Sequence, residues 1–312
     1  MTGRILITPR SLSKGGHPAL SALTARGYEL VMPTPGEIPD EPALLAAVPG
    51  CVGWLAGVEP VSGAVIHAAR KLRVISRNGS GVDNLPLALL KARNIPVFRA
   101  EGTNARGVAE LALAMTLAGL RRLVWTHEGM RKGGWPRSLG REIAGARIAV
   151  VGLGAIGTAY ARMCLDFGAL VAGTDPFAPP GALTGTGFTR TSLEGALAGA
   201  DVVSLHAPMP ADGQPLLTGA RISTLAQGAV VVNTARAGLV DPQAVRAALG
   251  SGRIACYATD VFETEPPAPS PLLAHPGVVM TSHIGGFTDA SVERSTIRAV
   301  ENLLLVLDGD AD

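Results

Sequence analysis

Hydrophobic and polar residues alternate along this chain in a way that predicts short buried strands separated by amphipathic helices. In the first hundred residues, five short apolar runs are typical of strands: 5–7, 29–32, 52–55, 74–76 and 96–98. Four stretches between them have helical spacing: 18–25, 42–48, 63–69 and 85–92. Alternation of strands and helices favours a parallel sheet that is covered by helices on both faces.

A second alternating series begins at Arg147, after one long helical stretch over residues 104–130 for which Asn104 is a candidate N-cap. Its expected strands are 148–151, 170–173, 202–205, 229–232, 255–258 and 278–281. The last expected element is a helix over 289–307, with an apolar stripe made of Val292, Ile297, Val300, Leu304 and Leu307. Two such series predict an α/β protein with two doubly wound, Rossmann-like domains built on parallel sheets.

Composition narrows the class of protein. The 312 residues fit about two domains, and a hydrophobic content of 47% supports a sizeable core. The net charge is only +2 and the basic residues are scattered, so we expect no nucleic-acid partner. No apolar run reaches about 18 residues, and the N-terminus does not resemble a signal peptide, so we expect a cytoplasmic protein with no membrane partner. Cys51, Cys164 and Cys256 are too dispersed to predict a disulfide framework or a metal site.

The segment 148–157 has the pattern of a dinucleotide-binding turn, a buried strand that runs into G-x-G-x-x-G. Gly152 allows the tight turn, Gly154 lets the backbone approach a pyrophosphate, and Gly157 lets the following helix pack on the strand. The helix N-terminus then offers N–H groups and a partial positive charge to the phosphates. Asp175 ends the next predicted strand, where a carboxylate binds ribose hydroxyls and repels a 2′-phosphate, so the sequence predicts NAD rather than NADP.

Three later predicted strands run into polar residues, which are Arg236, Glu265 and His283. Each alone could be a surface or loop residue, but ligands of open α/β sheets bind outside the carboxyl ends of the strands, where these three would meet. Arg236 offers a bidentate fork to a substrate carboxylate. His283 offers an imidazole for proton transfer, and a contact with Glu265 would orient it and favour its protonated form. Together they suit hydride transfer to a carboxylate-bearing ketone.

The sequence resembles the D-2-hydroxyacid dehydrogenase family, and within it the phosphoglycerate dehydrogenases. The segments that carry this resemblance occur in family order and span almost the whole chain: 79–84, 108–112, 152–157, 206–208, 233–238, 260–266 and 283–286. The resemblance implies a substrate-binding domain of residues 1–100 and 287–312 and an NAD-binding domain of residues 101–286. It also implies a homodimer that uses the region 104–130.

The resemblance also assigns roles to individual positions. It implies that Arg236, Glu265 and His283 are catalytic, with the histidine exchanging a proton with the oxygen of the 2-oxo or 2-hydroxy group. Positions that match NAD contacts are Thr103, Gly152, Gly154, Ala155, Ile156, Gly157, Asp175, His206, Ala207, Pro208, Thr234, Ala235, Arg236, Asp260, His283, Gly285 and Gly286. Among them, Asp260 matches the residue that holds the nicotinamide carboxamide. Positions that match substrate contacts are Arg77, Asn78, Gly79, Ser80, Gly81, Arg236 and His283.

The identity of the hydroxy acid stays open at this point. Arg77 and Arg137 match two phosphate-binding arginines of some phosphoglycerate dehydrogenases, but Ala56 stands at a third such position. The substrate is therefore 3-phosphoglycerate or a smaller acid such as glycerate, glycolate or lactate. Because Glu265 is not a glutamine, the resemblance favours a hydroxy acid over formate. The end of the chain at Asp312 predicts no regulatory domain and no control by serine.

A second class of function shares the same resemblance. Transcriptional corepressors built on this fold sense NAD, and they can retain the complete set of catalytic residues. Such a protein would dimerise in response to the nucleotide and have negligible turnover. No disordered tail or peptide-binding segment supports this alternative in the sequence.

Overall fold

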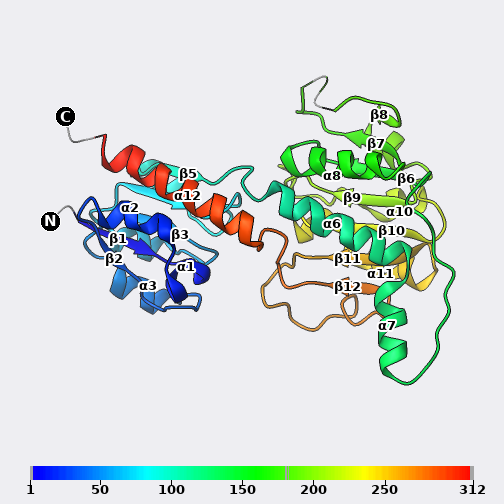
Figure 1. Cartoon of the computed structure of the whole chain (residues 1–312), viewed down its shortest axis with the longest axis horizontal. Coiled ribbons are helices and arrows are strands. Elements are labelled where there is room, and N and C mark those ends of the chain that lie inside the picture. The colour runs from blue at the N-terminus through cyan, green and yellow to red at the C-terminus, as the bar shows by residue number, and fades with distance from the viewer. Residues whose placement is uncertain (1–2, 180, 182, 310–312) are drawn as a thin grey trace. The chain divides into compact units, whose positions relative to one another are not determined.

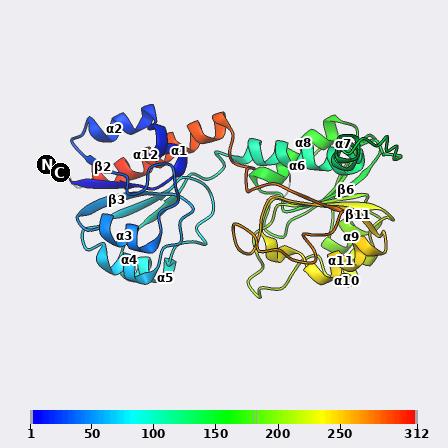
Figure 2. The ribbon, with the colours of Figure 1, turned by 90° about the horizontal axis from the view of Figure 1, so that it is seen from below.

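The computed structural model describes residues 3–179, 181 and 183–309. It divides into two compact units, one formed by Met1–Asn104 with Thr288–Asp312 and the other by Ala105–Phe287. Each unit is a parallel sheet with helices on both faces, as Figures 1 and 2 show. The predicted α/β fold class is thus confirmed. The predicted strands all form, and their ends agree within one residue.

The first unit contains a five-stranded sheet in the order β2-β1-β3-β4-β5. The strands are β1 (Arg4–Ile7), β2 (Glu29–Val31), β3 (Cys51–Ala56), β4 (Val74–Arg77) and β5 (Val97–Arg99). One face is covered by α1 (Arg10–Gly15), η1 (Pro18–Leu20), α2 (Ser21–Thr24) and α12 (Asp289–Leu307) (Figure 2). The other face is covered by α3 (Glu41–Ala47), α4 (Gly63–Ala68) and α5 (Leu87–Ala92).

The last helix, α12, belongs to the first unit although it ends the chain (Figure 1). It approaches β3 closely, since a Cβ added at Gly53 would lie 3.2 Å from Cδ1 of Leu307. The predicted apolar stripe of α12 is partly wrong, because Ile297 is 40% exposed while Ala299 and Leu303 are fully buried. Small side chains such as Ala299 let the helix lie close to the sheet, so burial on this helix does not follow hydrophobicity alone.

The second unit contains a seven-stranded sheet in the order β12-β11-β10-β9-β6-β7-β8. The strands are β6 (Arg147–Val151), β7 (Leu170–Thr174), β8 (Phe188–Arg190), β9 (Val202–Leu205), β10 (Ala229–Asn233), β11 (Ile254–Thr259) and β12 (Val278–Met280). The direction of strand addition reverses between β6 and β9, which makes this the topological switch point where ligands of doubly wound sheets bind.

Helices bury both faces of the second sheet (Figure 2). One face is covered by α6 (Ala105–Leu120) and α8 (Ala155–Asp166), and the other by α9 (Leu193–Leu197), α10 (Gly219–Ser223) and α11 (Pro242–Gly250). Along β6, Ile148 and Val150 enter the first core, whereas Ala149 and Val151 enter the second. This alternation explains why the central strands of the sequence are nearly continuous apolar runs.

The long helix predicted over residues 104–130 is wrong as a single element. It is divided into α6 and α7 (Leu123–Arg131) at Arg122, which has a left-handed backbone with φ of 55°. The Arg122 guanidinium donates to the carbonyl oxygen of Ala255 at 3.0 Å and stacks 4.7 Å from the ring of Trp125. These tertiary contacts fix the break. No range was predicted for the elements α1, β8, α9, α10 and α11 or for the short helix η2 (Ala237–Leu239), and the helix expected over 18–25 is divided into η1 and α2.

Candidate active site

The glycine-rich turn between β6 and α8 has the geometry that a dinucleotide requires. Gly152 has φ of +96°, and a Cβ there would lie 2.7 Å from the carbonyl oxygen of His206. A Cβ at Gly157 would overlap the carbonyl oxygen of Gly152. At Gly154, by contrast, a Cβ would point into open space at the N-terminus of the twelve-residue helix α8. This free cradle at the helix end fits the pyrophosphate of NAD.

Asp175 follows β7 and lies directly against the same turn. Its Oδ2 accepts a hydrogen bond from the N–H of Leu153 at 2.8 Å. Its Oδ1 accepts from the N–H groups of Phe177 and Ala178 at 2.8 and 3.0 Å. The carboxylate is therefore fixed beside the glycine turn.

The segment that follows β9, residues 206–208, contacts the glycine turn through its backbone and not through its side chains. His206 donates to or accepts from the Ser204 hydroxyl through Nε2 at 2.8 Å. Burial lowers the pKa of His206 to about 3, so its ring is neutral at physiological pH and unsuited to acid catalysis. The backbone of His206 and Ala207 instead lies against Gly152. Pro208 is exposed next to them.

Thr234, directly after β10, has a buried side chain that is 9% exposed. Within the described part of the chain its Oγ1 has no hydrogen-bond partner. Buried polar groups rarely stay unsatisfied, so this hydroxyl points to a bound polar ligand. It lies in the segment that the resemblance places beside NAD, and so it supports the fit of that cofactor.

The side chains of His283 and Glu265 form an ion pair in the second unit. Nδ1 of His283 lies 2.8 Å from Oε2 and 2.9 Å from Oε1 of Glu265. Phe262 also donates its N–H to Oε1 of Glu265 at 3.3 Å, which helps to hold the carboxylate. The His283 side chain remains 51% exposed. Because Nδ1 is engaged by the carboxylate, the imidazole can present its other nitrogen, Nε2, to a ligand.

Arg236 lies in a turn that the buried side chain of Asn233 organises. Asn233 ends β10 and is fully buried. Its Nδ2 donates to the carbonyl oxygen of Arg236 at 2.8 Å, and its Oδ1 accepts from the N–H of Ala235 at 3.1 Å. The guanidinium of Arg236 in turn donates to the carbonyl oxygen of Ala235 at 2.7 Å. Asn233 lies in the segment 233–238 that carries the family resemblance, but it was assigned no role from the sequence.

The end of β4 and the loop that follows it, in the first unit, contain five of the residues predicted to bind substrate, which are Arg77, Asn78, Gly79, Ser80 and Gly81. Arg77 is 8% exposed and donates to the carbonyl oxygen of Asn78 at 2.8 Å. Its guanidinium lies under Gly79, where a Cβ would be 3.3 Å from one of its nitrogens. Ser80 donates to Oδ1 of Asn104 at 3.3 Å. Arg77 thus supports the backbone of residues 78–79, and Gly81 follows half-buried.

Three further positions that the sequence singled out are Thr103, Arg137 and Ala56. The Thr103 hydroxyl donates to the carbonyl oxygen of Ala100 at 2.7 Å and lies 2.7 Å from the hydroxyl of Ser295, all within the first unit. Arg137 is exposed in the second unit, in the segment after α7. Ala56 is fully buried and offers no charge.

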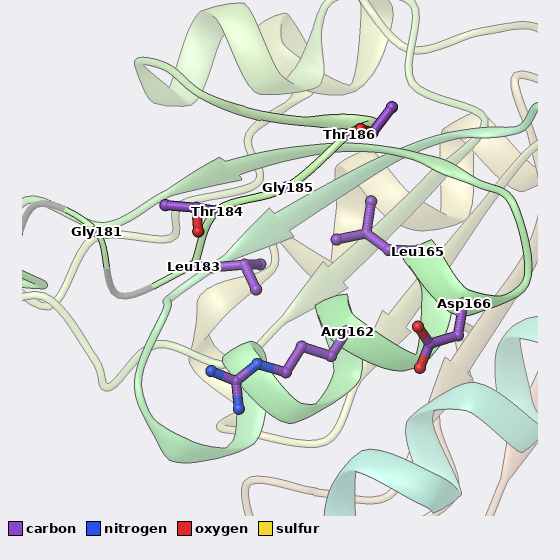
Figure 3. A pocket seen from close by; sticks show the side chains of 8 residues that line it. All are labelled: Arg162, Leu165, Asp166, Gly181, Leu183, Thr184, Gly185 and Thr186. Atoms are coloured by element: carbon purple, nitrogen blue, oxygen red, sulfur yellow. The ribbon is translucent and has the colours of Figure 1, made fainter.

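A pocket of about 350 Å³ lies elsewhere, between the C-terminal half of α8 and the segment before β8 (Figure 3). Arg162, Leu165 and Asp166 line it from the helix, and Leu183 and Thr186 from the other side. Arg162 is seven residues beyond Ala155, or about 10 Å along the helix axis. The pocket therefore lies away from the glycine turn. Among residues 3–179, 181 and 183–309, no cluster of three metal-ligating side chains occurs, and no helix is long and apolar enough to cross a membrane.

Comparison with known proteins identifies the family to which the chain belongs. The NAD-binding domain model of the D-isomer specific 2-hydroxyacid dehydrogenases matches residues 113–285. The chain belongs to this family, and NAD is the cofactor that this membership indicates. The match ends at Gly285, so it includes the glycine turn, Arg236 and the His283–Glu265 pair.

The chain is also similar to individual members of the family. It is 36% identical over 275 residues to a D-3-phosphoglycerate dehydrogenase of Mycobacterium tuberculosis, covering 87% of this chain but only 52% of that protein. It is 32% identical to a hydroxypyruvate reductase of Thermotoga maritima, covering 78% of this chain and 80% of the relative. The solved structure of the TT0316 protein from Thermus thermophilus superposes with a TM-score of 0.88 at 36% identity, covering 98% and 97% of the two chains.

Proposed function

We propose that this protein is an NAD-dependent dehydrogenase that interconverts a D-2-hydroxy acid and its 2-oxo acid. The observation that carries the proposal is the His283–Glu265 pair, with Nδ1 held 2.8 Å from a carboxylate oxygen. The pair occurs in the same unit as a glycine turn that fits NAD and an arginine suited to a carboxylate. The family's NAD-binding domain and relatives named for 2-hydroxy acid chemistry support the same reaction.

The roles of the chain's residues follow from their chemistry. NAD, when bound, supplies or accepts the hydride. Arg236 binds the substrate carboxylate through its planar fork. In the direction of oxidation, His283 takes the proton of the substrate hydroxyl at Nε2, and it returns that proton in reduction. Glu265 orients the ring through Nδ1 and stabilises the positive charge that the imidazole gains.

The two units take different roles in this proposal. The second unit binds NAD through the glycine turn, Asp175, the 206–208 segment and the strand-end loops. The first unit binds substrate through the loop 77–81, whose backbone Arg77 supports. The family resemblance assigns Thr103 and Asp260 to the binding of NAD. The Thr103 hydroxyl is already engaged within the first unit by Ala100 and Ser295.

We further propose that the protein is a homodimer that uses α7 and the segment after it. No residue of α7 is buried. Leu123 and Met130 on this helix are 61% and 45% exposed, and Trp135 and Leu139 just beyond it are 77% and 100% exposed. These exposed apolar side chains on α7 and just after it support the choice of this region. Light scattering of the purified protein tests the dimer, and a monomer at micromolar concentration would contradict it.

The experiment that tests the function is a panel of 2-oxo acids with NADH, followed by the loss of NADH absorbance. Hydroxypyruvate, glyoxylate, pyruvate and phosphohydroxypyruvate should include at least one good substrate, and His283→Ala should remove most turnover while NADH still binds. Preference for phosphohydroxypyruvate would identify 3-phosphoglycerate as the hydroxy acid. Failure of every 2-oxo acid, together with NAD-dependent association, would favour the corepressor alternative.

A further inference from the structure

One buried carboxylate holds the loop that contains His283. Asp260 is 2% exposed and follows β11 directly. Its Oδ1 accepts hydrogen bonds from the Thr281 hydroxyl at 2.6 Å and from the N–H of Ile284 at 2.8 Å. Its Oδ2 accepts from the N–H of Gly285 at 2.8 Å. These bonds lie on both sides of His283 in the chain.

We call the three hydrogen bonds to Asp260, from Thr281, Ile284 and Gly285, the Asp260 clamp. This clamp matters because His283 has an unfavourable backbone conformation. Its φ is 55°, in the left-handed region that residues with a side chain seldom adopt. Such a conformation persists only where the surrounding structure enforces it, and it is concentrated at functional sites. The hydrogen bonds from Thr281, Ile284 and Gly285 to a charged acceptor provide that enforcement.

Within this clamp, Thr281 differs from Ile284 and Gly285 because it donates through its side-chain hydroxyl and not through a backbone N–H. Backbone N–H groups are present whatever the residue, whereas the short 2.6 Å bond to Oδ1 depends on the threonine hydroxyl. That bond fixes the rotation of the Asp260 carboxylate, and the rotation sets where Ile284 and Gly285 can bind. A carboxylate has about four acceptor positions, so Asp260 retains one for a further donor such as the carboxamide of NAD.

We propose that Thr281 is a positioning residue for the reaction proposed above, acting through Asp260 to hold the imidazole of His283 against Glu265. The inference rests on the proposed function, because it gives the orientation of His283 a purpose. It does not make Thr281 catalytic, since its hydroxyl is directed to Asp260 and not to the imidazole.

Kinetics of the conservative variants provide the first test. Thr281→Val keeps the shape of the side chain and removes the hydroxyl, so kcat should fall about tenfold through misalignment of the imidazole. Thr281→Ser should restore most of the lost kcat, because a serine hydroxyl can make the same bond to Oδ1 of Asp260. Thr218→Val is the matched control, because its hydroxyl also makes one contact, with the N–H of Arg221 at 3.5 Å before α10. This control should keep the wild-type kcat.

Amide hydrogen exchange provides a second test that does not depend on turnover. Thr281→Val should accelerate exchange of the Ile284 and Gly285 amides about tenfold or more, because both donate to Asp260. An inactive wild-type protein would refute the proposed function, while the exchange rates would still decide whether the clamp exists. Unchanged exchange in Thr281→Val, or unchanged kcat in an active enzyme, would overturn the inference.

A second variant keeps the inference testable if Thr281→Val does not fold. Gly285→Ala would place a Cβ 3.0 Å from Oδ2 of Asp260 and displace the same carboxylate from its other side. Exchange of the Ile284 amide should then accelerate as well. A protected Ile284 amide in Gly285→Ala would show that the carboxylate does not control this loop.

Discussion

Removing the negative charge of Glu265 should slow oxidation of the 2-hydroxy acid more than it weakens binding. In Glu265→Gln, the side chain keeps its size and an oxygen that can still accept from Nδ1 of His283. What is lost is the carboxylate charge, 2.8 Å from the ring, that stabilises the imidazole as it takes a proton. The variant therefore separates the charge of Glu265 from its role in orientation.

The magnitude follows from the distance and the exposure. An ion pair at 2.8 Å gains about 1.5 kcal/mol in water and about 6 kcal/mol at an effective dielectric constant of about 20. The two side chains are 51% and 39% exposed, so solvent screening keeps the value near the lower end, at about 1.5–3 kcal/mol. A loss of this size in the transition state corresponds to a decrease in kcat of roughly 10- to 150-fold.

The assay is steady-state formation of NADH from NAD and the hydroxy acid that the wild-type enzyme oxidises best. Glu263→Gln is the matched control, since it removes the same charge from an exposed residue two positions earlier in the same loop. Glu265→Ala, which removes orientation as well, should lose more activity than Glu265→Gln. The reasoning is refuted if Glu265→Gln oxidises within twofold of wild type, or loses no more activity than the control.

Three other predictions concern the glycine turn, cofactor choice and stability in acid. Gly157→Ala should abolish NADH binding and destabilise the fold, because its Cβ would overlap the Gly152 carbonyl oxygen. Gly154→Ala should fold normally and only weaken the binding of NADH, because a Cβ there meets no other atom. Equal thermal stability of the two variants would contradict this prediction. Asp175→Asn should raise the affinity for NADPH relative to NADH about tenfold, measured by fluorescence titration, because a phosphate no longer faces a carboxylate. Burial lowers the pKa of His206 to about 3, against about 6.5 unfolded, so its contribution is present above pH 6.5 and is lost as the pH falls toward 3. Urea unfolding should therefore show a smaller loss of stability between pH 6.5 and 5 in His206→Gln, by up to about 2 kcal/mol.

The central strands could be predicted from the sequence because both faces of each sheet are covered by helices, so that these strands are nearly continuous apolar runs. The edge strand β8, which is Phe188-Thr189-Arg190 and largely exposed, lacks that signal and was not predicted. The break at Arg122 could not be predicted from local sequence. Its guanidinium bonds the carbonyl oxygen of Ala255, which is 133 residues away in the chain, and stacks on Trp125 in the folded protein. The helix α1 was missed because only Leu12 and Ser13 of its six residues are buried. Local periodicity carries no information about such elements.

The candidate site was predictable to the extent that one rule applies, namely that ligands bind at the carboxyl ends of parallel strands. That rule selects Arg236, Glu265 and His283, and the structure pairs the last two directly. The rule also covers Asn233 and Thr281, which lie at strand ends, but it does not show that their contribution is to hold the folded loops. Sequence spacing cannot show which carbonyl or carboxylate such a side chain will reach.

The acidic residues at the strand ends have a second role that changes how their mutation should be interpreted. Loops that leave a parallel sheet carry N–H groups that the strands do not satisfy, and a carboxylate can only accept hydrogen bonds. Asp175 accordingly accepts from three backbone N–H groups, and Asp260 accepts from two and a hydroxyl. Loss of activity on replacing either aspartate is thus not evidence of contact with NAD, since the loop would move as well. Only a measurement that separates cofactor affinity from loop order, such as NADH binding beside amide exchange, can assign the residue to the ligand or to the fold.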